Sequence, residues 1–132
     1  MKTAEQLIQQ AKSQINEIGV DEFFAVIKET QPILIDVREP DEFQAGAIAG
    51  AVNFPRGVLE MKICQHPIAA AYVEPIAALT FLKDQPIYLI CGTSGRSALA
   101  AETLQRMGFT QVKSIQGGYE AWQQHGYPIQ TH

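Results

Sequence analysis

The sequence has little cysteine, no long apolar run and no excess of basic residues. It contains two cysteines, Cys64 and Cys91, and no CxxC or Cys/His spacing that would indicate a metal such as zinc. No window approaches the ~20 apolar residues of a membrane span, and the first residues lack the apolar stretch of a secretory signal. We therefore expect a cytoplasmic protein with free thiols, no bound metal and no membrane partner.

The shortage of basic charge also restricts the class of partner. The formal net charge is −4 at pH 7 and the isoelectric point is about 5.3, which argues against a protein that neutralises many nucleic-acid phosphates. Of the 132 residues, 46% are hydrophobic and 18% are charged, as in a globular domain. We expect a single domain that binds no nucleic acid and attracts any anion through local groups.

Strand-like and helix-like segments alternate along the chain. Short apolar runs bounded by proline, glycine or charged residues predict strands at 33–35, 51–54, 87–90 and 112–115. Helical patterns are found between and after these runs: from 21 to the break at 30–32, from 40 to about 46, after 75, up to the capping Gly108, and at 119–124. Residues 62–73 fit a loop or a broken helix. The alternation predicts an α/β fold with a largely parallel sheet covered on both faces.

The N-terminus carries an amphipathic pattern of its own. Four apolar residues recur there at helical spacing: Leu7, Ala11, Ile15 and Ile18. They predict a helix that ends near Gln14 and packs on the main domain. We therefore divide the chain into an N-terminal helical extension, residues 1–17, and a main domain, residues 18–132.

The segment CGTSGR, residues 91–96, follows a predicted strand and precedes a helical pattern. Ligands of parallel sheets bind beyond the carboxyl ends of the strands, and Cys91 is at such an end. A helix N-terminus supplies unpaired N–H groups and positive potential, which favour a thiolate. Gly92 and Gly95 allow the amides to turn inward as an anion nest, and Arg96 adds a permanent charge. The pattern favours a nucleophile over the alternative of a buried core cysteine.

Three stretches of the sequence, in order, carry a family resemblance. They are LIDVREPDEFQAGAIAGAVNFPRGVLE at 34–60, YLICGTSGRSALAAETLQRMGF at 88–109 and VKSIQGGYEAWQQHGYPI at 112–129. They resemble the signatures of the single-domain rhodaneses, or thiosulfate sulfurtransferases, and the resemblance covers about residues 18–129. It implies a rhodanese-like domain at 18–132, with three α/β/α layers around a central, mainly parallel five-stranded sheet.

The resemblance implies a role for each matching residue. Cys91 is similar to the family's sulfur-accepting nucleophile, and the loop residues that surround its persulfide and bind substrate are then Gly92, Thr93, Ser94, Gly95 and Arg96. Asp36 and Arg38 match residues that give structural support to buried loops. Arg56 follows the Asn-x-Pro turn and is expected near the mouth of the site, as a substrate contact.

Other positions match packing residues or depart from the pattern. Gly117 and Gly118 match a glycine pair that brings the backbone close to the active site, and Trp122 matches a packing position. Ala47 replaces the histidine that the family usually has in its Gly-His-Ile segment. We expect this departure to remove one polar contact without abolishing activity, because the catalytic loop is intact.

The resemblance leaves sulfur transfer and phosphate chemistry to be separated by loop size. Four residues lie between Cys91 and Arg96, whereas five separate the corresponding residues in phosphatases of this fold. The shorter ring fits the terminal sulfur of a persulfide better than a phosphate group. We therefore expect transfer from a donor such as thiosulfate to a thiol or cyanide, or to an acceptor protein, without a cofactor. The alternatives are a noncatalytic rhodanese-like regulatory or interaction module and a phosphatase or arsenate-type enzyme.

Some residues are assigned no part in this chemistry. Cys64 is expected to be an exposed or half-buried bystander rather than a thiol that resolves the persulfide. The scattered histidines, His66, His125 and His132, are expected to lie on the surface without binding a ligand.

Overall fold

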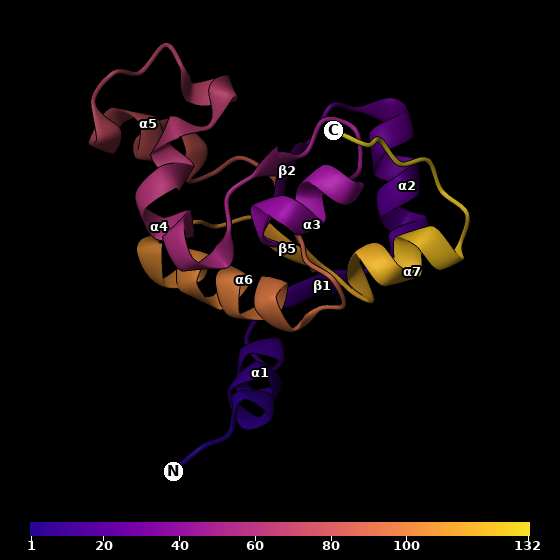
Figure 1. The fold of residues 1–132 in the computed structure, drawn as a ribbon. Coiled ribbons are helices and arrows are strands. Elements are labelled where there is room, and N and C mark those ends of the chain that lie inside the picture. The colour runs from indigo at the N-terminus through magenta and orange to yellow at the C-terminus, as the bar shows by residue number, and fades with distance from the viewer.

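Helices cover both faces of a five-stranded sheet in the computed structural model, which describes residues 1–132 (Figure 1). All strand pairs are parallel, and the order across the sheet is β1-β5-β4-β2-β3. The strands are β1 (Asn16–Ile18), β2 (Ile33–Asp36), β3 (Val52–Asn53), β4 (Ile87–Ile90) and β5 (Val112–Ile115). The predicted fold class is confirmed.

The helices follow the pattern of the sequence. They are α1 (Ala4–Lys12), α2 (Val20–Glu29), α3 (Pro40–Ala45), α4 (Leu59–Lys62), α5 (Pro75–Leu82), α6 (Gly95–Met107) and α7 (Gly118–Gln124). The uncertain segment before α5 contains α4 and short 3-10 turns at Ile63–Gln65 and Pro67–Ala69. Gly108 caps α6 in the left-handed region, at a φ of 108°, as predicted.

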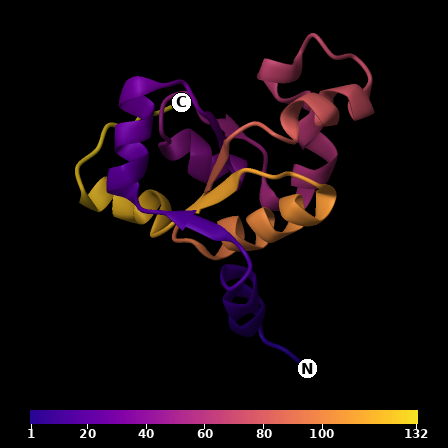
Figure 2. The same cartoon turned by 180° about the vertical axis from the view of Figure 1, so that it is seen from behind.

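The core has two parts because adjacent side chains of a strand point to opposite faces of the sheet. Ile33 and Ile35 belong to the larger cluster, which packs against α4, α5 and α6. Leu34 belongs to the smaller cluster, which includes Trp122 of α7 and Phe23 of α2. Figures 1 and 2 show α2 and α7 together on one side of the molecule, away from α4 and α5.

The N-terminal prediction is wrong in one respect. Helix α1 ends at Lys12, and Ile18, which was included in the helical pattern, lies in strand β1 and pairs with Ile115 of β5. Asn16 and Glu17, which we assigned to the extension, belong to the same strand. A strand of three residues shows too short a pattern to be separated from a helix, and its position depends on pairing with a distant strand.

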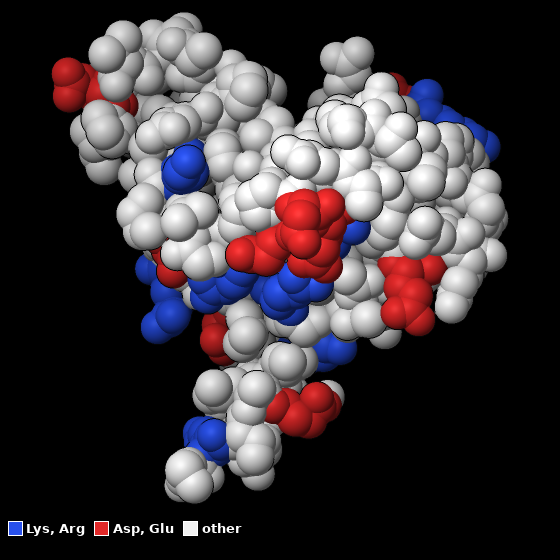
Figure 3. All heavy atoms as spheres, viewed as in Figure 1, with Lys and Arg blue, Asp and Glu red and all other residues white.

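The lobe around α5 presents an apolar surface. Its exposed apolar residues include Met61, Ile68, Tyr72, Val73 and Ile76. The same lobe is mostly free of charge in Figure 3, where acidic and basic atoms gather at the centre of the face instead. No helix of the structure has the length and apolar character that crossing a membrane would require.

The C-terminal residues pair with backbone groups in and directly after α3. Ala47 and Gln130 exchange two backbone hydrogen bonds, each of 2.8 Å. The backbone N–H of His132 also donates to the carbonyl of Gln44 in α3. These bonds attach the last residues to the helix that follows β2.

Candidate active site

The candidate nucleophile lies at the carboxyl end of β4, in the middle of the sheet. Cys91 directly follows β4, and α6 begins at Gly95, so strand, cysteine, turn and helix follow one another as the sequence predicts. The cysteine is 1% exposed, and its Sγ donates a hydrogen bond to Ser97 Oγ over 3.4 Å. The thiol is therefore buried against the first turn of α6.

The N-terminus of α7 holds two carbonyl groups of the turn. The N–H of Tyr119 donates to the carbonyl of Cys91 over 2.8 Å, and that of Glu120 donates to the carbonyl of Gly92 over 2.9 Å. In a trans peptide the N–H points opposite to the C=O, and the chain has no cis bond. The amides of Gly92 and Thr93 therefore point away from α7, which orients the first part of the predicted amide ring.

The close approach of α7 to the turn requires glycine. Gly117 and Gly118 have φ values of 82° and 60°, which residues with a side chain rarely adopt. A Cβ on Gly118 would also collide with the carbonyl oxygens of Cys91 and Thr93. The glycine pair thus lies where the family resemblance implies, against the loop that contains the cysteine.

A pair of buried hydroxyl groups adjoins the thiol. Ser97 Oγ lies 2.7 Å from Ser114 Oγ, and it also donates to the carbonyl of Ser94 over 3.3 Å. A hydroxyl group can donate one hydrogen bond and accept two. When Cys91 loses its proton, the Ser97 hydroxyl can rotate to donate to Sγ while Ser114 donates to Ser97. The same two serines can therefore stabilise both the thiol and the thiolate.

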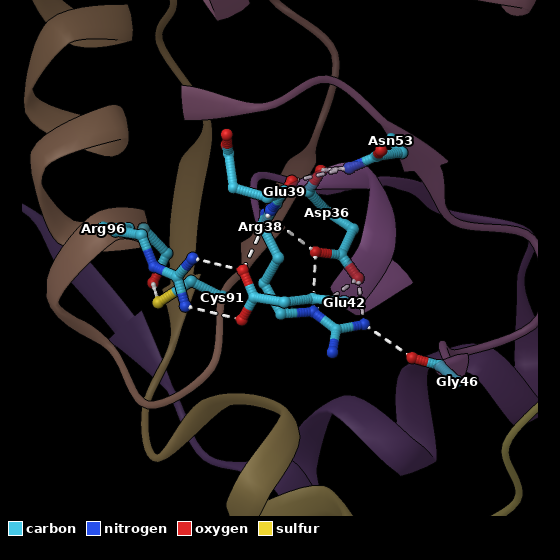
Figure 4. A network of polar contacts seen from close by, with 9 residues as sticks. Asp36, Arg38, Glu39, Glu42, Gly46, Asn53, Cys91 and Arg96 are labelled. Atoms are coloured by element: carbon cyan, nitrogen blue, oxygen red, sulfur yellow. Dashed lines mark hydrogen bonds and ion pairs between the residues drawn. The ribbon is translucent and has the colours of Figure 1, made fainter. Parts of the chain in front are cut away.

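Glu42 of α3 holds the arginine at the end of the turn (Figure 4). The guanidinium of Arg96 donates from Nη1 to Glu42 Oε1 over 2.7 Å and from Nη2 to Oε2 over 3.1 Å. Glu42 Oε1 also accepts the backbone N–H of Glu39 over 3.1 Å, as part of a capping box at the start of α3. The position of the carboxylate is thus set by its own helix.

This ion pair covers the start of the turn. Nη2 of Arg96 lies 2.9 Å from the position that a Cβ on Gly92 would occupy. The hydrogen bonds with Arg96 lower the pKa of the Glu42 carboxyl, and those with Glu42 raise the pKa of Arg96. Their side chains remain 36% and 40% exposed. A charged, solvent-accessible pair therefore lies over the loop that contains the buried cysteine.

Arg38 and Asp36, which were predicted to give structural support, form a second arginine pair that is buried. Arg38 donates from Nη2 to Asp36 Oδ2 over 2.8 Å and to the carbonyl of Gly46 over 2.7 Å. Its guanidinium carbon lies 4.1 Å from the centre of the Tyr119 ring, and Asn53 donates to the carbonyls of both Asp36 and Arg38. The hydrogen bonds connect the turn after β2 to β3 and to the end of α3 (Figure 4), and the ring contact connects it to α7.

The hydrogen bonds of the Arg56 side chain go to residues outside the turn. Its guanidinium contacts Glu60 over 3.3 Å and Thr103 over 3.0 Å. Thr103 lies seven residues after Arg96 in α6, a distance of roughly 10 Å along the helix axis. The expectation that Arg56 contacts the donor stays a prediction.

Two other residues named in the sequence analysis, Ala47 and Cys64, interact with backbone groups. Ala47 is fully buried, and its backbone pairs with Gln130. Cys64 is free and half-buried, with its Sγ donating to the carbonyl of Met61. No group of three or more His, Cys, Asp or Glu side chains is arranged to hold a metal ion.

The prediction that His66 lies on the surface is wrong. The residue is buried, at 8% exposure, and its Nδ1 caps the 3-10 turn at 67–69 by accepting the N–H of Ile68. Burial lowers the pKa of this imidazole, and its Nε2 has no hydrogen-bond partner. A histidine followed by Pro67 has the pattern of a helix cap, and that signal was available in the sequence.

Sequence reasoning missed four residues near the turn. They are Lys12, Glu42, Ser97 and Ser114. Ser97 follows Arg96 directly and could have been included with the loop. The other three come from α1, α3 and β5, and only the folded sheet brings these elements together.

The sequence matches the family model of the rhodanese-like domain over residues 19–125. The chloroplastic thiosulfate sulfurtransferase 16 of Arabidopsis thaliana is 38% identical over 100 residues, which are 74% of this chain and 78% of that protein. A sulfurtransferase of Allochromatium vinosum is 27% identical over 116 residues, 87% of this chain and 94% of that protein. A solved structure from Rhodopseudomonas palustris, described as a possible tyrosine phosphatase, has a TM-score of 0.81 and 32% identity, covering 98% of this chain and 96% of its own.

Proposed function

Because the chain belongs to the rhodanese-like domain family, we propose that it transfers a sulfane sulfur through a persulfide on Cys91. Its relatives include sulfurtransferases from a plant and a bacterium. The donor is thiosulfate or a similar compound, and the acceptor is a thiophile such as cyanide, a cellular thiol or an acceptor protein. The observation that carries the proposal is the buried cysteine at the end of β4, next to hydroxyl and amide donors.

The first step forms the persulfide. Cys91 gives up its proton to solvent, and the thiolate is stabilised by the Ser97 hydroxyl and by the N-terminus of α6. The thiolate attacks the outer sulfur of thiosulfate, a sulfur–sulfur bond forms, and the bond to the sulfonate sulfur breaks. Sulfite leaves with the electron pair of that bond. Cys91 is left with one extra sulfur, as a persulfide anion.

The second step empties the site. A nucleophilic acceptor attacks the terminal sulfur of the persulfide, and the Cys91 thiolate leaves with the electron pair. With cyanide the product is thiocyanate, and with a thiolate it is a new persulfide. The amides of Gly92 and Thr93, directed away from α7, are suited to donate to the terminal sulfur in the intermediate. The cycle restores the enzyme and needs no external oxidant or reductant.

The Arg96–Glu42 pair lies over the start of the turn that contains the thiol. Cys91 is 1% exposed, and the Arg96 guanidinium over Gly92 is held by Glu42. The anionic oxygens of the donor are alternative partners for this guanidinium. We therefore assign Arg96 to donor binding, with Glu42 as the group from which the donor takes it.

The decisive experiment is intact-mass analysis after incubation with thiosulfate. The wild type is expected to gain the mass of one sulfur atom, and cyanide should remove it as thiocyanate. Cys91→Ser should gain none, whereas Cys64→Ser, which removes the other free thiol, should gain it like the wild type. Equal sulfur loading of Cys91→Ser would contradict the mechanism, and no loading of the wild type would favour the noncatalytic module.

A phosphatase is the second candidate function, because the similar structure from Rhodopseudomonas palustris carries that description. The short loop between Cys91 and Arg96 speaks against it. An aryl phosphate should therefore not be hydrolysed by the wild type under conditions in which the persulfide forms. Hydrolysis that depends on Cys91, without sulfur loading, would reverse this assignment.

A further inference from the structure

Helix α1 reaches the candidate active site. Lys12, in its last turn, donates from Nζ to Ser94 Oγ over 2.8 Å in a half-buried contact. Ile8, one turn earlier, lies against Gly95, where an added Cβ would be 2.8 Å from Ile8 Cδ1. Both views of the ribbon place α1 beneath α6, against which it packs (Figures 1 and 2). Two side chains of α1 therefore touch the turn that follows β4.

These contacts come from outside the part of the chain that matches the family. The family match begins at residue 19, whereas α1 ends at Lys12. The extension is therefore more than a helix that packs on the domain, because it adds a side chain to the loop that contains the cysteine.

The charge of Lys12 is not neutralised by a carboxylate. The ion pairs of the structure involve Arg38, Arg56, Lys83, Arg96 and His125, and Lys12 is in none of them. Its ammonium instead donates to a neutral hydroxyl oxygen. Arg96 differs, since Glu42 offsets its charge. Two cationic side chains therefore lie at the turn, Lys12 and Arg96. Only Lys12 has no carboxylate partner, so its charge is available to attract anions.

The hydrogen bond also orients Ser94. Because Ser94 Oγ accepts from Lys12, its own hydrogen remains available to donate to another group. A hydroxyl polarised by a cation is a better donor to an anion. Lys12 can thus act on the donor through Ser94 without touching it.

We propose that Lys12 is a positioning residue that fixes the Ser94 hydroxyl and makes the site selective for donors of high negative charge. The inference rests on the proposed function, since it names the class of donor for the same cysteine. Dianionic thiosulfate is favoured over monoanionic donors such as an aromatic thiosulfonate.

The test compares two donors in steady-state kinetics with cyanide as the acceptor. Lys12→Gln should lower kcat/KM for thiosulfate by about three- to tenfold, mainly through KM, because one positive charge and one charged hydrogen bond are lost. The loss should be smaller for benzenethiosulfonate, and Lys12→Arg should restore most of the difference. Lys2→Gln, the same charge change at an exposed residue before α1, is the matched control. Equal losses for both donors would overturn the selectivity.

A second measurement does not depend on sulfur transfer. The rates at which Cys91 is alkylated by iodoacetate, an anion, and by iodoacetamide, which is neutral, are compared by peptide mass analysis. Lys12→Gln should lower the ratio of the two rates about threefold, and it should lower it less in a Ser94→Ala background. An unchanged ratio in Lys12→Gln would overturn the inference even if the wild type transfers sulfur. A lowered ratio in a protein that forms no persulfide would contradict the proposed function alone.

Discussion

The turns after β2 and β4 are at the same edge of the sheet, and an arginine of each forms an ion pair with a carboxylate. The two strands are neighbours, with Asp36 opposite Ile90. In the β2 turn, Arg38 and Asp36 are both buried, and their side chains are 5% and 1% exposed. In the β4 turn, Arg96 and its partner Glu42 are 40% and 36% exposed. An arginine–carboxylate pair therefore occurs once in the protein interior and once in contact with solvent.

The difference in burial decides which of the two arginines is able to leave its carboxylate and bind a ligand. Removing one partner of a buried pair costs about 3–5 kcal/mol, because the other charge is left without water. An exposed pair contributes about 0–1 kcal/mol, because water replaces the lost partner. Arg38 therefore cannot exchange Asp36 for a ligand, whereas Arg96 can exchange Glu42 for an anion at little cost. Changes in each pair test this contrast, and a third change concerns a buried group outside both pairs.

The largest effect is expected in the buried pair. Asp36→Asn leaves Arg38 without a counter-charge and should lower the free energy of unfolding by about 3–5 kcal/mol, measured by denaturant titration. The double variant Asp36→Asn/Arg38→Met should recover part of this loss, since no unpaired charge remains. At temperatures where both variants are folded, the KM for thiosulfate should stay close to that of the wild type. If KM changes in a variant that is fully folded at the assay temperature, Arg38 takes part in binding the donor.

The exposed pair should respond in kinetics rather than in stability. Glu42→Gln keeps an oxygen that can accept the N–H of Glu39, but it weakens the hold on Arg96. We expect the KM for thiosulfate to fall about two- to fivefold and the free energy of unfolding to fall by less than about 1 kcal/mol. Asp41→Asn makes the same charge change in the same turn of α3 and is the control.

The lowered pKa of Glu42 gives this variant a pH signature. A carboxyl whose pKa is lowered by folding stabilises the protein above its ordinary pKa, and this stabilisation is lost as the pH falls through the lowered value. The wild type should lose this contribution only in acid, and Glu42→Gln should lack it. A higher KM in Glu42→Gln would show that the glutamate positions Arg96 for the donor instead of competing with it.

The smallest effect concerns a buried group away from both turns. The pKa of His66 is lowered by burial, so the unfolded chain binds a proton at a higher pH than the folded protein does. Stability should therefore fall as the pH drops from about 7.5 to about 5.5. His66→Asn keeps an acceptor for the N–H of Ile68 without titrating in this range, and it should show a flatter pH dependence in urea titrations. The exposed His132, changed to Gln, should leave the wild-type slope unaltered.

Local patterns carried most of what the sequence predicted. The strand, glycine-containing turn and helix around Cys91 follow one another within residues 87–107, so apolar runs and capping residues suffice to predict them. The same holds for Gly108, whose left-handed conformation ends α6. The position of the candidate nucleophile could therefore be predicted without knowledge of the rest of the fold.

The unpredicted features depend on contacts between distant segments. Glu42 and Arg96 are 54 positions apart, and Lys12 and Ser94 are 82 apart. Nothing in either segment specifies its partner, because surface charges of these kinds occur on most helices. Strand β1 was missed for a related reason, since three residues form a strand only by pairing with β5. The partners of Arg56, Glu60 and Thr103, likewise could not be read from the turn that precedes it.

The bridge between Ala47 and Gln130 has a practical consequence for anyone who purifies the protein. A tag or a fused domain at the C-terminus is attached close to Gln130, whose bonds secure the segment after α3, and α3 carries Glu42. A tag in front of Met1 is attached close to α1, which contacts Ser94. The kinetic constants of tagged protein should therefore be compared with those of the protein after the tag is removed. Val73, which is 91% exposed and lies before α5, offers an insertion point in neither of these segments.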